Sequence, residues 1–383
     1  MKFEDGSFFQ FPNTRRSFSN LREILPVRVV PRGGSGITEL PRAENGDIDA
    51  LQFVPMNSAE PMTWAQSLEA NYTDGILILH KGRIIYERYP GALTASGQHI
   101  AFSVTKSFVA TIAASLISEG AFGENEAVVR YVPELSGSGL ADATIRQLLD
   151  MTTGLRFTEV YAEGTSPFWE FCMANGFLPR PPRYTGAESS HAFLQGLAKE
   201  NPHGARFVYK TVNTDTLAWV MAKVTGRSIS ELLYDRFWSK LGVEQDAFFT
   251  VDSRGVEFAG AGLNLALRDL ARFGEMIRLG GRYNGQQIVP TSVIEDIRRG
   301  GDREQFSVAG YKTLPGWSYR SMWWVSHNDH GAFTARGIHG QAIYIDPKAE
   351  IVITRFASHP LAANFNLDPT SLPAYTALAN SLI

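Results

Sequence analysis

Ser103-Val104-Thr105-Lys106 opens an apolar segment that continues as Ser107-Phe-Val-Ala-Thr-Ile-Ala-Ala-Ser-Leu-Ile117. The segment predicts a buried helix that ends near Gly120. Ser103 and Lys106, three positions apart, would lie on one face of that helix. A neutral lysine amine one turn away can take the proton of a serine hydroxyl, and burial at the positive helix end would lower the lysine pKa. The pair therefore predicts nucleophilic catalysis by Ser103.

The same four residues have a structural interpretation. Lys106 is the one lysine of nine with Ser at position i−3, and about one such match is expected by chance in a chain of this length. Ser103 would then cap the helix, and Lys106 would be a solvated residue of its first turn. The choice between the two interpretations depends on partners elsewhere in the chain.

Tyr209 is the first of these partners and precedes a predicted helix over residues 213–226. A phenol can relay a proton between serine, lysine and leaving group if nearby positive charge lowers its pKa. A half-buried structural tyrosine in front of a helix is the alternative. Tyr161 and the pair Trp323-Trp324 are candidates for a substrate pocket, with core packing as the alternative for the tryptophans.

The segment Ala335-Arg-Gly-Ile-His-Gly-Gln341 predicts a strand edge that approaches a substrate closely, because glycines leave room for it. Acyl transfer needs two N–H donors aimed at the oxyanion. The N–H of Ser103 can be one donor, and this strand can supply the other. His339 lacks a partner at metal-ligand spacing, so we expect a structural or substrate-contacting role and no metal site.

Composition limits the classes of function. The 383 residues are 44% hydrophobic and 20% charged with a net charge of −3, which gives no support for nucleic-acid binding. We expect no membrane span and no secretory signal, because residues 1–20 lack an apolar run behind a basic start. The only cysteine, Cys172, rules out an internal disulfide. These features predict a cytoplasmic protein that acts on a small molecule, with a homodimer as one allowed assembly.

Apolar periodicity and turn residues predict the secondary structure. Residues 1–60 are expected to form an irregular arm, and 155–206 a loop-rich stretch. The remaining predicted elements are a hairpin over 74–80 and 83–89, helices over 142–151, 213–226, 228–241 and 262–280, strands over 321–325, 340–346 and 350–355, and a last helix over 374–383.

This order predicts an α+β fold in which an antiparallel sheet is flanked by helices and a mostly helical domain is inserted. We expect one domain from residues 1–125 and 260–383, carrying the Ser103 helix and the sheet. The second would comprise 126–259 and carry Tyr209.

Taken together, these motifs resemble those of class C β-lactamases and family VIII esterases, and most closely those of the 6-aminohexanoate-dimer (nylon-oligomer) hydrolases. The resemblance covers the chain from about residue 75 to its end. The matching pieces are Ser103-x-x-Lys106, Tyr209-x-x-x-Asn213-Thr214-Asp215-x-Leu217-Ala218-Trp219, Val224-Thr225-Gly226, Arg268-Asp269-Leu270-Ala271-Arg272, Trp323-Trp324, Gly337-Ile338-His339-Gly340-Gln341 and Asp346-Pro347.

The resemblance implies a β-lactamase/transpeptidase-like fold and a role for each matching residue. Ser103 would be the nucleophile, Lys106 its base and Tyr209 the proton relay to the leaving group. The N–H groups of Ser103 and Ile338 would form the oxyanion hole. The remaining residues implied or expected to bind substrate are Tyr161, Trp324 and His339. No metal or organic cofactor would be required.

Several positions depart from the family pattern. Thr211 stands where the family has the Asn of Tyr-x-Asn, and Ala335 replaces the lysine of the β-lactamase Lys-Thr-Gly strand. That lysine helps to hold the β-lactam carboxylate, and Arg336 would replace its charge only by pointing inward. Gly260 and Cys172 fall near positions where the amide-cleaving nylon enzymes carry polar residues.

The predicted function is therefore a serine hydrolase that cleaves carboxylic esters or small linear amides, similar to 6-aminohexanoate oligomers, through an acyl-enzyme. A β-lactamase or D-alanyl-D-alanine carboxypeptidase is the first alternative, disfavoured by the absent signal and strand lysine. A catalytically silent binding protein on the same scaffold is the second. A conventional α/β-hydrolase is disfavoured because the chain has no Gly-x-Ser-x-Gly motif.

Overall fold

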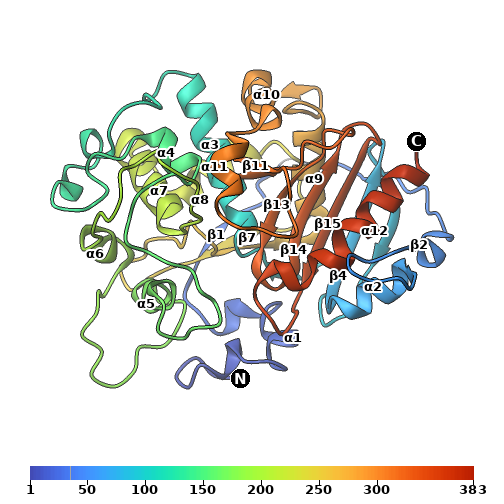
Figure 1. Ribbon diagram of the computed structural model, residues 1–383, viewed down its shortest axis with the longest axis horizontal. Coiled ribbons are helices and arrows are strands. Elements are labelled where there is room, and N and C mark those ends of the chain that lie inside the picture. Colours follow the sequence, from blue (N-terminus) through green and yellow to red (C-terminus); the bar gives the residue numbers. More distant parts are fainter. Residues whose placement is uncertain (35) are drawn as a thin grey trace.

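The largest sheet of the protein is antiparallel and has seven strands in the order β11-β12-β13-β14-β15-β4-β5 (Figure 1). The computed structural model describes residues 1–34 and 36–383. The strands are β11 (Ser318–Arg320), β12 (Trp323–Val325), β13 (Phe333–Gly337), β14 (Gln341–Asp346), β15 (Ile351–Ala357), β4 (Thr73–His80) and β5 (Arg83–Arg88). The predicted hairpin β4-β5 is confirmed, and the predicted strands over 340–346 and 350–355 pair as the hairpin β14-β15. Since β15 also pairs with β4, the two ends of the chain share one sheet.

Helices cover both faces of this sheet, which confirms the predicted α+β class. Ile76 and Ile78 of β4 pack into one hydrophobic cluster with α2 (Trp64–Ala70) and α12 (Asp368–Ser381). Leu77 and Leu79 point to the opposite face, which α3 (Val104–Ser118) and α9 (Leu267–Arg278) cover. The period of two along β4 produces this division. The last helix begins at Asp368 rather than at residue 374, with Pro369 in its first turn, where proline is tolerated.

A second antiparallel sheet has the strand order β1-β7-β8-β6. Its strands are β1 (Val27–Val30), β7 (Ala247–Thr250), β8 (Leu263–Ala266) and β6 (Gln98–Ile100). Two predictions are wrong here. Residues 1–60 include β1, which is held by pairing with β7, and residues 263–266 of the predicted helix form β8. A four-residue apolar run does not distinguish a strand from the start of a helix, and tertiary pairing decides.

The helices between α3 and β7 lie together on one side of the molecule, opposite the large sheet (Figure 1). The predicted loop-rich stretch 155–206 contains two short helices that the prolines and glycines there obscured, α5 and α6. The helices of this part are α4 (Ile145–Leu149), α5 (Pro167–Ala174), α6 (Ser190–Gln195), α7 (Val212–Thr225) and α8 (Ile229–Leu233), the last running into a π-helical turn at Tyr234–Trp238.

Short elements complete the chain. They are α1 (Thr14–Ser17), α10 (Thr291–Arg299), α11 (Arg303–Ser307), the strand pairs β2 (Gln52–Phe53) with β3 (Met62–Thr63) and β9 (Arg282–Tyr283) with β10 (Gln286–Gln287), and the 3₁₀ turns Ser7–Phe9, Leu21–Glu23, Ile48–Ala50, Val128–Arg130, Pro133–Leu135, Ile338–Gly340 and Asn364–Asn366. Within the part of the chain that the structure describes, no helix is both long and apolar enough to cross a bilayer.

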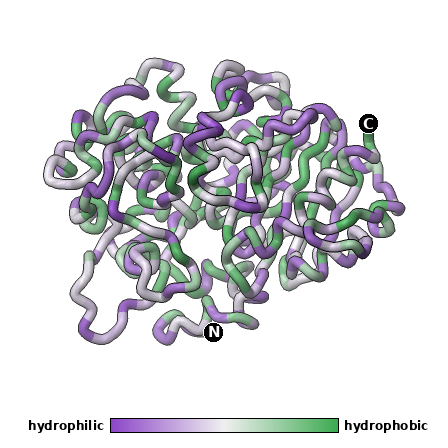
Figure 2. Tube along the Cα trace, in the orientation of Figure 1, coloured by the Kyte–Doolittle hydropathy of each residue, from purple (hydrophilic) through white to green (hydrophobic). Residues whose placement is uncertain are grey.

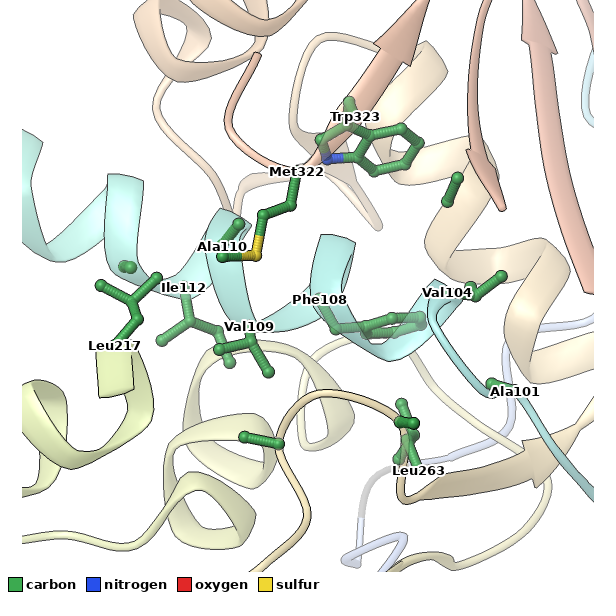
Figure 3. Packing of buried hydrophobic residues seen from close by; sticks show 14 of the residues in the cluster. Ala101, Val104, Phe108, Val109, Ala110, Ile112, Leu217, Leu263, Met322 and Trp323 are labelled. Atoms are coloured by element: carbon green, nitrogen blue, oxygen red, sulfur yellow. The ribbon is translucent and has the colours of Figure 1, made fainter. Parts of the chain in front are cut away.

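Helix α3 runs through the interior and fixes the position of its first turn. Figure 2 shows hydrophobic residues recurring along the central strands and helices, with mainly hydrophilic outer loops. In the close view, α3 side chains such as Phe108 and Val109 lie among Leu217 of α7, Leu263 of β8 and Trp323 of β12 (Figure 3). The helix ends as predicted before Gly120, whose φ of 79° is left-handed.

Candidate active site

Ser103 and Lys106 meet at the start of α3. Lys106 Nζ donates hydrogen bonds to Ser103 Oγ over 2.9 Å and to the carbonyl oxygen of Gly260 over 2.7 Å. The Ser103 side chain makes no capping bond, and Lys106 is fully buried. Both observations contradict the structural interpretation of a capping serine beside a solvated lysine. The structure instead places the lysine nitrogen directly against the serine hydroxyl.

Burial lowers the pKa of Lys106 to about 8, although the Glu159 and Asp215 carboxylates oppose this shift. An unburied lysine is almost entirely protonated at neutral pH, whereas about a tenth of this one would be neutral at pH 7. The neutral amine has a lone pair that can accept the Ser103 proton. The electrostatics therefore suit a base.

Tyr209 faces the same pair of residues. Its ring centroid is 5.1 Å from Lys106 Nζ, and its ring stacks on Trp324 with centroids 5.6 Å apart. Burial, followed by the Glu159 carboxylate, raises the pKa of Tyr209 well above its usual value, while the Ser103 hydroxyl opposes the shift. The condition placed on the proton relay, a pKa lowered by nearby positive charge, is therefore not met, because burial outweighs that charge. Tyr209 is a neutral phenol, which can donate a proton.

The end of β13 approaches the start of α3 very closely. A Cβ atom on Gly337 would lie 2.7 Å from the carbonyl oxygen of Ala101, so this position excludes a side chain. Ile338 follows in a short 3₁₀ turn and lines the same cavity as Ser103. The glycine-containing strand therefore ends against the start of α3, and its close approach to a substrate stays a prediction.

A cavity of about 120 Å³ opens at Ser103, and five of its eleven lining residues are aromatic. It brings together five of the predicted site residues. The cavity is lined by Ser103, Tyr161, Tyr209, Tyr311, Trp324, Arg336, Ile338, Ala363, Asn364, Phe365 and Asp368. Arg336 does point inward, and its charge is paired with Asp368.

His339 lies outside the residues that line this cavity. Its ring is buried among Phe9, Phe18 and Phe102, and Nδ1 lies 2.7 Å from the carbonyl oxygen of His359. Burial lowers its pKa to about 4. This geometry favours the structural role over contact with a substrate. Across residues 1–34 and 36–383, no group of three or more His, Cys, Asp or Glu side chains is arranged to hold a metal ion.

Two carboxyl groups beside the site, half-buried Glu159 and buried Asp215, were not singled out from the sequence. Glu159 accepts hydrogen bonds from the Thr211 N–H and, over 2.9 Å, from the Tyr161 hydroxyl. Burial raises its pKa. The side chain belongs to a loop, and no motif marks it in the sequence.

Asp215 lies on α7, and neither of its carboxylate oxygens has a hydrogen-bond partner among the described residues. Burial raises its pKa to about 8, and Lys106 opposes the shift. A Cβ atom on Gly260 would lie 2.7 Å from Asp215 Oδ2 and 2.3 Å from Thr211 Cγ2. Close packing therefore excludes a side chain at position 260, whose carbonyl oxygen also accepts the hydrogen bond from Lys106. In the sequence, the one indication that Asp215 lies near the site was its position within the Tyr209 motif.

Comparisons with known proteins show the family to which the chain belongs. The family model described as Beta-lactamase matches residues 66–370. The 6-aminohexanoate-dimer hydrolase of Paenarthrobacter ureafaciens is 32% identical over 355 residues, which cover 92% of this chain and 88% of that protein.

Solved structures show the same fold. A Bacillus anthracis protein, provisionally assigned as a 6-aminohexanoate-dimer hydrolase, superposes with a TM-score of 0.90 at 30% identity, covering 99% of this chain and 97% of that one. A family VIII carboxylesterase has a TM-score of 0.59 at 17% identity, covering 82% and 96%, and is similar in fold alone. The chain therefore belongs to the β-lactamase-fold family of serine hydrolases and, within it, is a homologue of the 6-aminohexanoate-dimer hydrolases.

Proposed function

We propose that Ser103 is the nucleophile of this hydrolase, Lys106 its base and Tyr209 the donor to the leaving group. The main support for this assignment is the buried Lys106 amine, which lies 2.9 Å from Ser103 Oγ. In the first half-reaction, Lys106 accepts the Ser103 proton while Oγ bonds to the substrate carbonyl carbon. The carbonyl electron pair moves to the oxygen, which the N–H groups of Ser103 and Ile338 stabilise.

Collapse of this intermediate breaks the bond to the leaving group. Tyr209 donates its proton to that group and recovers one from Lys106, leaving an acyl-enzyme and a neutral lysine. Water then attacks the acyl carbon by the same route, and the free acid is released with Ser103 regenerated. The neutral phenol of Tyr209 supports this direction of proton transfer.

We infer that the substrates are carboxylic esters or small linear amides, similar to 6-aminohexanoate oligomers. The support is the 32% identity to a 6-aminohexanoate-dimer hydrolase and a small cavity to which five aromatic side chains contribute. Tyr161 and Trp324 would contact the substrate there. The reaction would need no metal or organic cofactor.

The first alternative is a β-lactamase or D-alanyl-D-alanine carboxypeptidase. Arg336 is the cation nearest in sequence to the absent strand lysine, and its pairing with Asp368 argues against capture of a β-lactam carboxylate. Parallel assays with nitrocefin and p-nitrophenyl acetate separate the two activities. We expect hydrolysis of the ester and little or none of nitrocefin.

The second alternative is a catalytically silent binding protein. Covalent labelling of the nucleophile distinguishes it from an active hydrolase. A fluorophosphonate probe should modify Ser103, located by peptide mass spectrometry, and the label should be lost in Ser103→Ala and Lys106→Ala. Labelling of another residue, or hydrolysis that survives in Ser103→Ala, would contradict the proposal. Absence of both label and ester hydrolysis in a folded protein would favour the silent scaffold.

We further propose a cytoplasmic enzyme, supported by a single cysteine, Cys172, that is buried as a free thiol. A homodimer stays one allowed assembly, which light scattering after size exclusion would test. The two-domain division at residues 126 and 260 also stays a proposal. Limited proteolysis should cut near these boundaries if it holds.

A further inference from the structure

Two opposite charges meet on the wall of the cavity that contains Ser103. Arg336 Nη2 forms an ion pair with Asp368 Oδ1, joining the end of β13 to the first residue of α12. Among the described residues that line the cavity, these two carry the formal charges. A substrate in the cavity therefore meets a neutralised pair instead of a free cation or anion.

The surroundings hold both members of the pair in place. The Arg336 and Asp368 side chains are only 9% and 5% exposed. Asp368 Oδ2 accepts a second hydrogen bond from Thr313 Oγ1 over 2.6 Å. The Arg336 guanidinium carbon lies 5.1 Å from the centroid of the Trp324 ring, within the range of a cation–π interaction. The guanidinium charge is thus already engaged by a carboxylate and an aromatic ring before any substrate arrives.

Resting on the proposed function, we infer that this ion pair makes the enzyme select against esters and amides whose acyl chain carries a carboxylate. Asp368 is the specificity-determining residue, because it pairs with the Arg336 guanidinium, which would otherwise bind a substrate carboxylate. A carboxylate entering the cavity must displace Asp368 from a charge-assisted bond or stay partly desolvated without a partner. An uncharged acyl chain avoids both costs.

The test compares two esters of equal chain length, p-nitrophenyl hexanoate and the mono-p-nitrophenyl ester of adipic acid. They differ in a terminal methyl against a terminal carboxylate. For each protein, the adipate-to-hexanoate ratio of kcat/KM is measured within one preparation, so that loss of folded protein cancels. We expect the wild-type enzyme to favour hexanoate by about tenfold or more, as for a charge without a partner in a partly desolvated site.

Asp368→Asn keeps an acceptor for Thr313 but removes the charge that neutralises Arg336. We expect this variant to raise the adipate-to-hexanoate ratio about tenfold or more, because Arg336 becomes free to pair with the substrate. Arg336→Gln leaves Asp368 as an unpaired anion and should lower the ratio below that of the wild type. The double variant Asp368→Asn/Arg336→Gln should lose the gain, since the gain requires the guanidinium.

Glu350→Gln is the matched control, since it removes one negative charge from an exposed side chain that does not line this cavity. An equal rise in Glu350→Gln, or a gain that survives in the double variant, overturns the inference. So does a ratio that neither single variant changes. If the wild type hydrolyses neither ester and Ser103 takes no fluorophosphonate label, the proposed function fails instead. Hydrolysis of both esters with unaltered ratios defeats the charge selectivity alone.

Discussion

Lys106 Nζ and Ser103 Oγ are 2.9 Å apart, one helical turn from each other, and the lysine is wholly enclosed by protein. The close contact and the enclosure have one origin, because the turn that carries both residues opens a helix buried along most of its length. The geometry of the pair is set before substrate binds, and burial keeps part of the amine neutral. The pH at which the enzyme works follows from this relationship.

Ester hydrolysis should rise with pH and level off above about pH 8, where burial places the pKa of Lys106. The base acts in its deprotonated form, so kcat/KM should fall about tenfold per pH unit below that midpoint. Lys210 is the control, because burial also lowers its pKa to about 8 while its Nζ donates to the Thr153 carbonyl over 3.2 Å. Lys210→Met should keep the profile, and Lys106→Met should abolish the activity. A rate that stays flat down to pH 4 would remove Lys106 from the mechanism.

Replacing Tyr209 by Phe should affect amides more than activated esters. An amine leaving group must be protonated as it departs, whereas p-nitrophenolate leaves without a proton. We expect kcat for a small linear amide to fall about 10²- to 10⁴-fold, the usual contribution of a general acid, with a smaller loss for p-nitrophenyl acetate. Tyr319→Phe removes a buried hydroxyl next to Tyr209 but outside the cavity and should leave the amide-to-ester ratio unchanged. Equal losses on both substrates would contradict the assignment.

A methyl group at Gly260 should damage both stability and activity. Its Cβ would lie 2.3 Å from Thr211 Cγ2, and relieving this contact would move the carbonyl that accepts from Lys106. We expect Gly260→Ala to lower the free energy of unfolding by about 1–3 kcal/mol, a typical cost of overpacking, together with kcat. Gly137→Ala is the control, since a Cβ there meets nothing within 4 Å. Denaturant unfolding and kcat, measured in parallel on both variants, test this prediction. A free energy of unfolding and a kcat equal to those of the wild type in Gly260→Ala would contradict it.

Stability should fall on acidification partly because of His339. Burial lowers its pKa to about 4 from a usual 6.5, so the unfolded chain takes up a proton there before the folded one does. Its contribution is fully present above pH 6.5 and is lost as the pH falls to about 4, by about 3 kcal/mol. His339→Asn does not titrate, and asparagine tolerates the left-handed φ of 61° at this position. The free energy of unfolding of this variant should depend less on pH between 6.5 and 4 than that of the wild type. If the two proteins show the same pH dependence, His339 does not contribute to the loss of stability in acid.

Features that depend on residues close together along the chain could be predicted from the sequence, and those that depend on distant residues could not. Ser103 and Lys106 were predictable because a helix places positions three apart on one face. Tyr209 and the β13 segment were found through their resemblance to a family pattern. Glu159 and Asp215 become neighbours of Lys106 only through tertiary packing, and the raised pKa of Tyr209 depends on burial that no local pattern records.

The errors in secondary structure have the same cause. β1 lies in a stretch with the composition of a loop and becomes a strand by pairing with β7. β8 runs directly into α9, so its apolar residues appeared to belong to the helix. In both segments a distant partner, absent from any local window, decides the backbone conformation.

The pairing of β15 with both β14 and β4 has a consequence for biosynthesis. The nucleophile is made early and the strand that flanks the candidate oxyanion hole is made late, so a ribosome-bound chain lacking its last strands has Ser103 but an incomplete site. Such non-local pairings form slowly. Hydrolysis should therefore begin only after the C-terminal strands have docked, and ester cleavage would serve as a direct signal that a newly made chain has folded to completion.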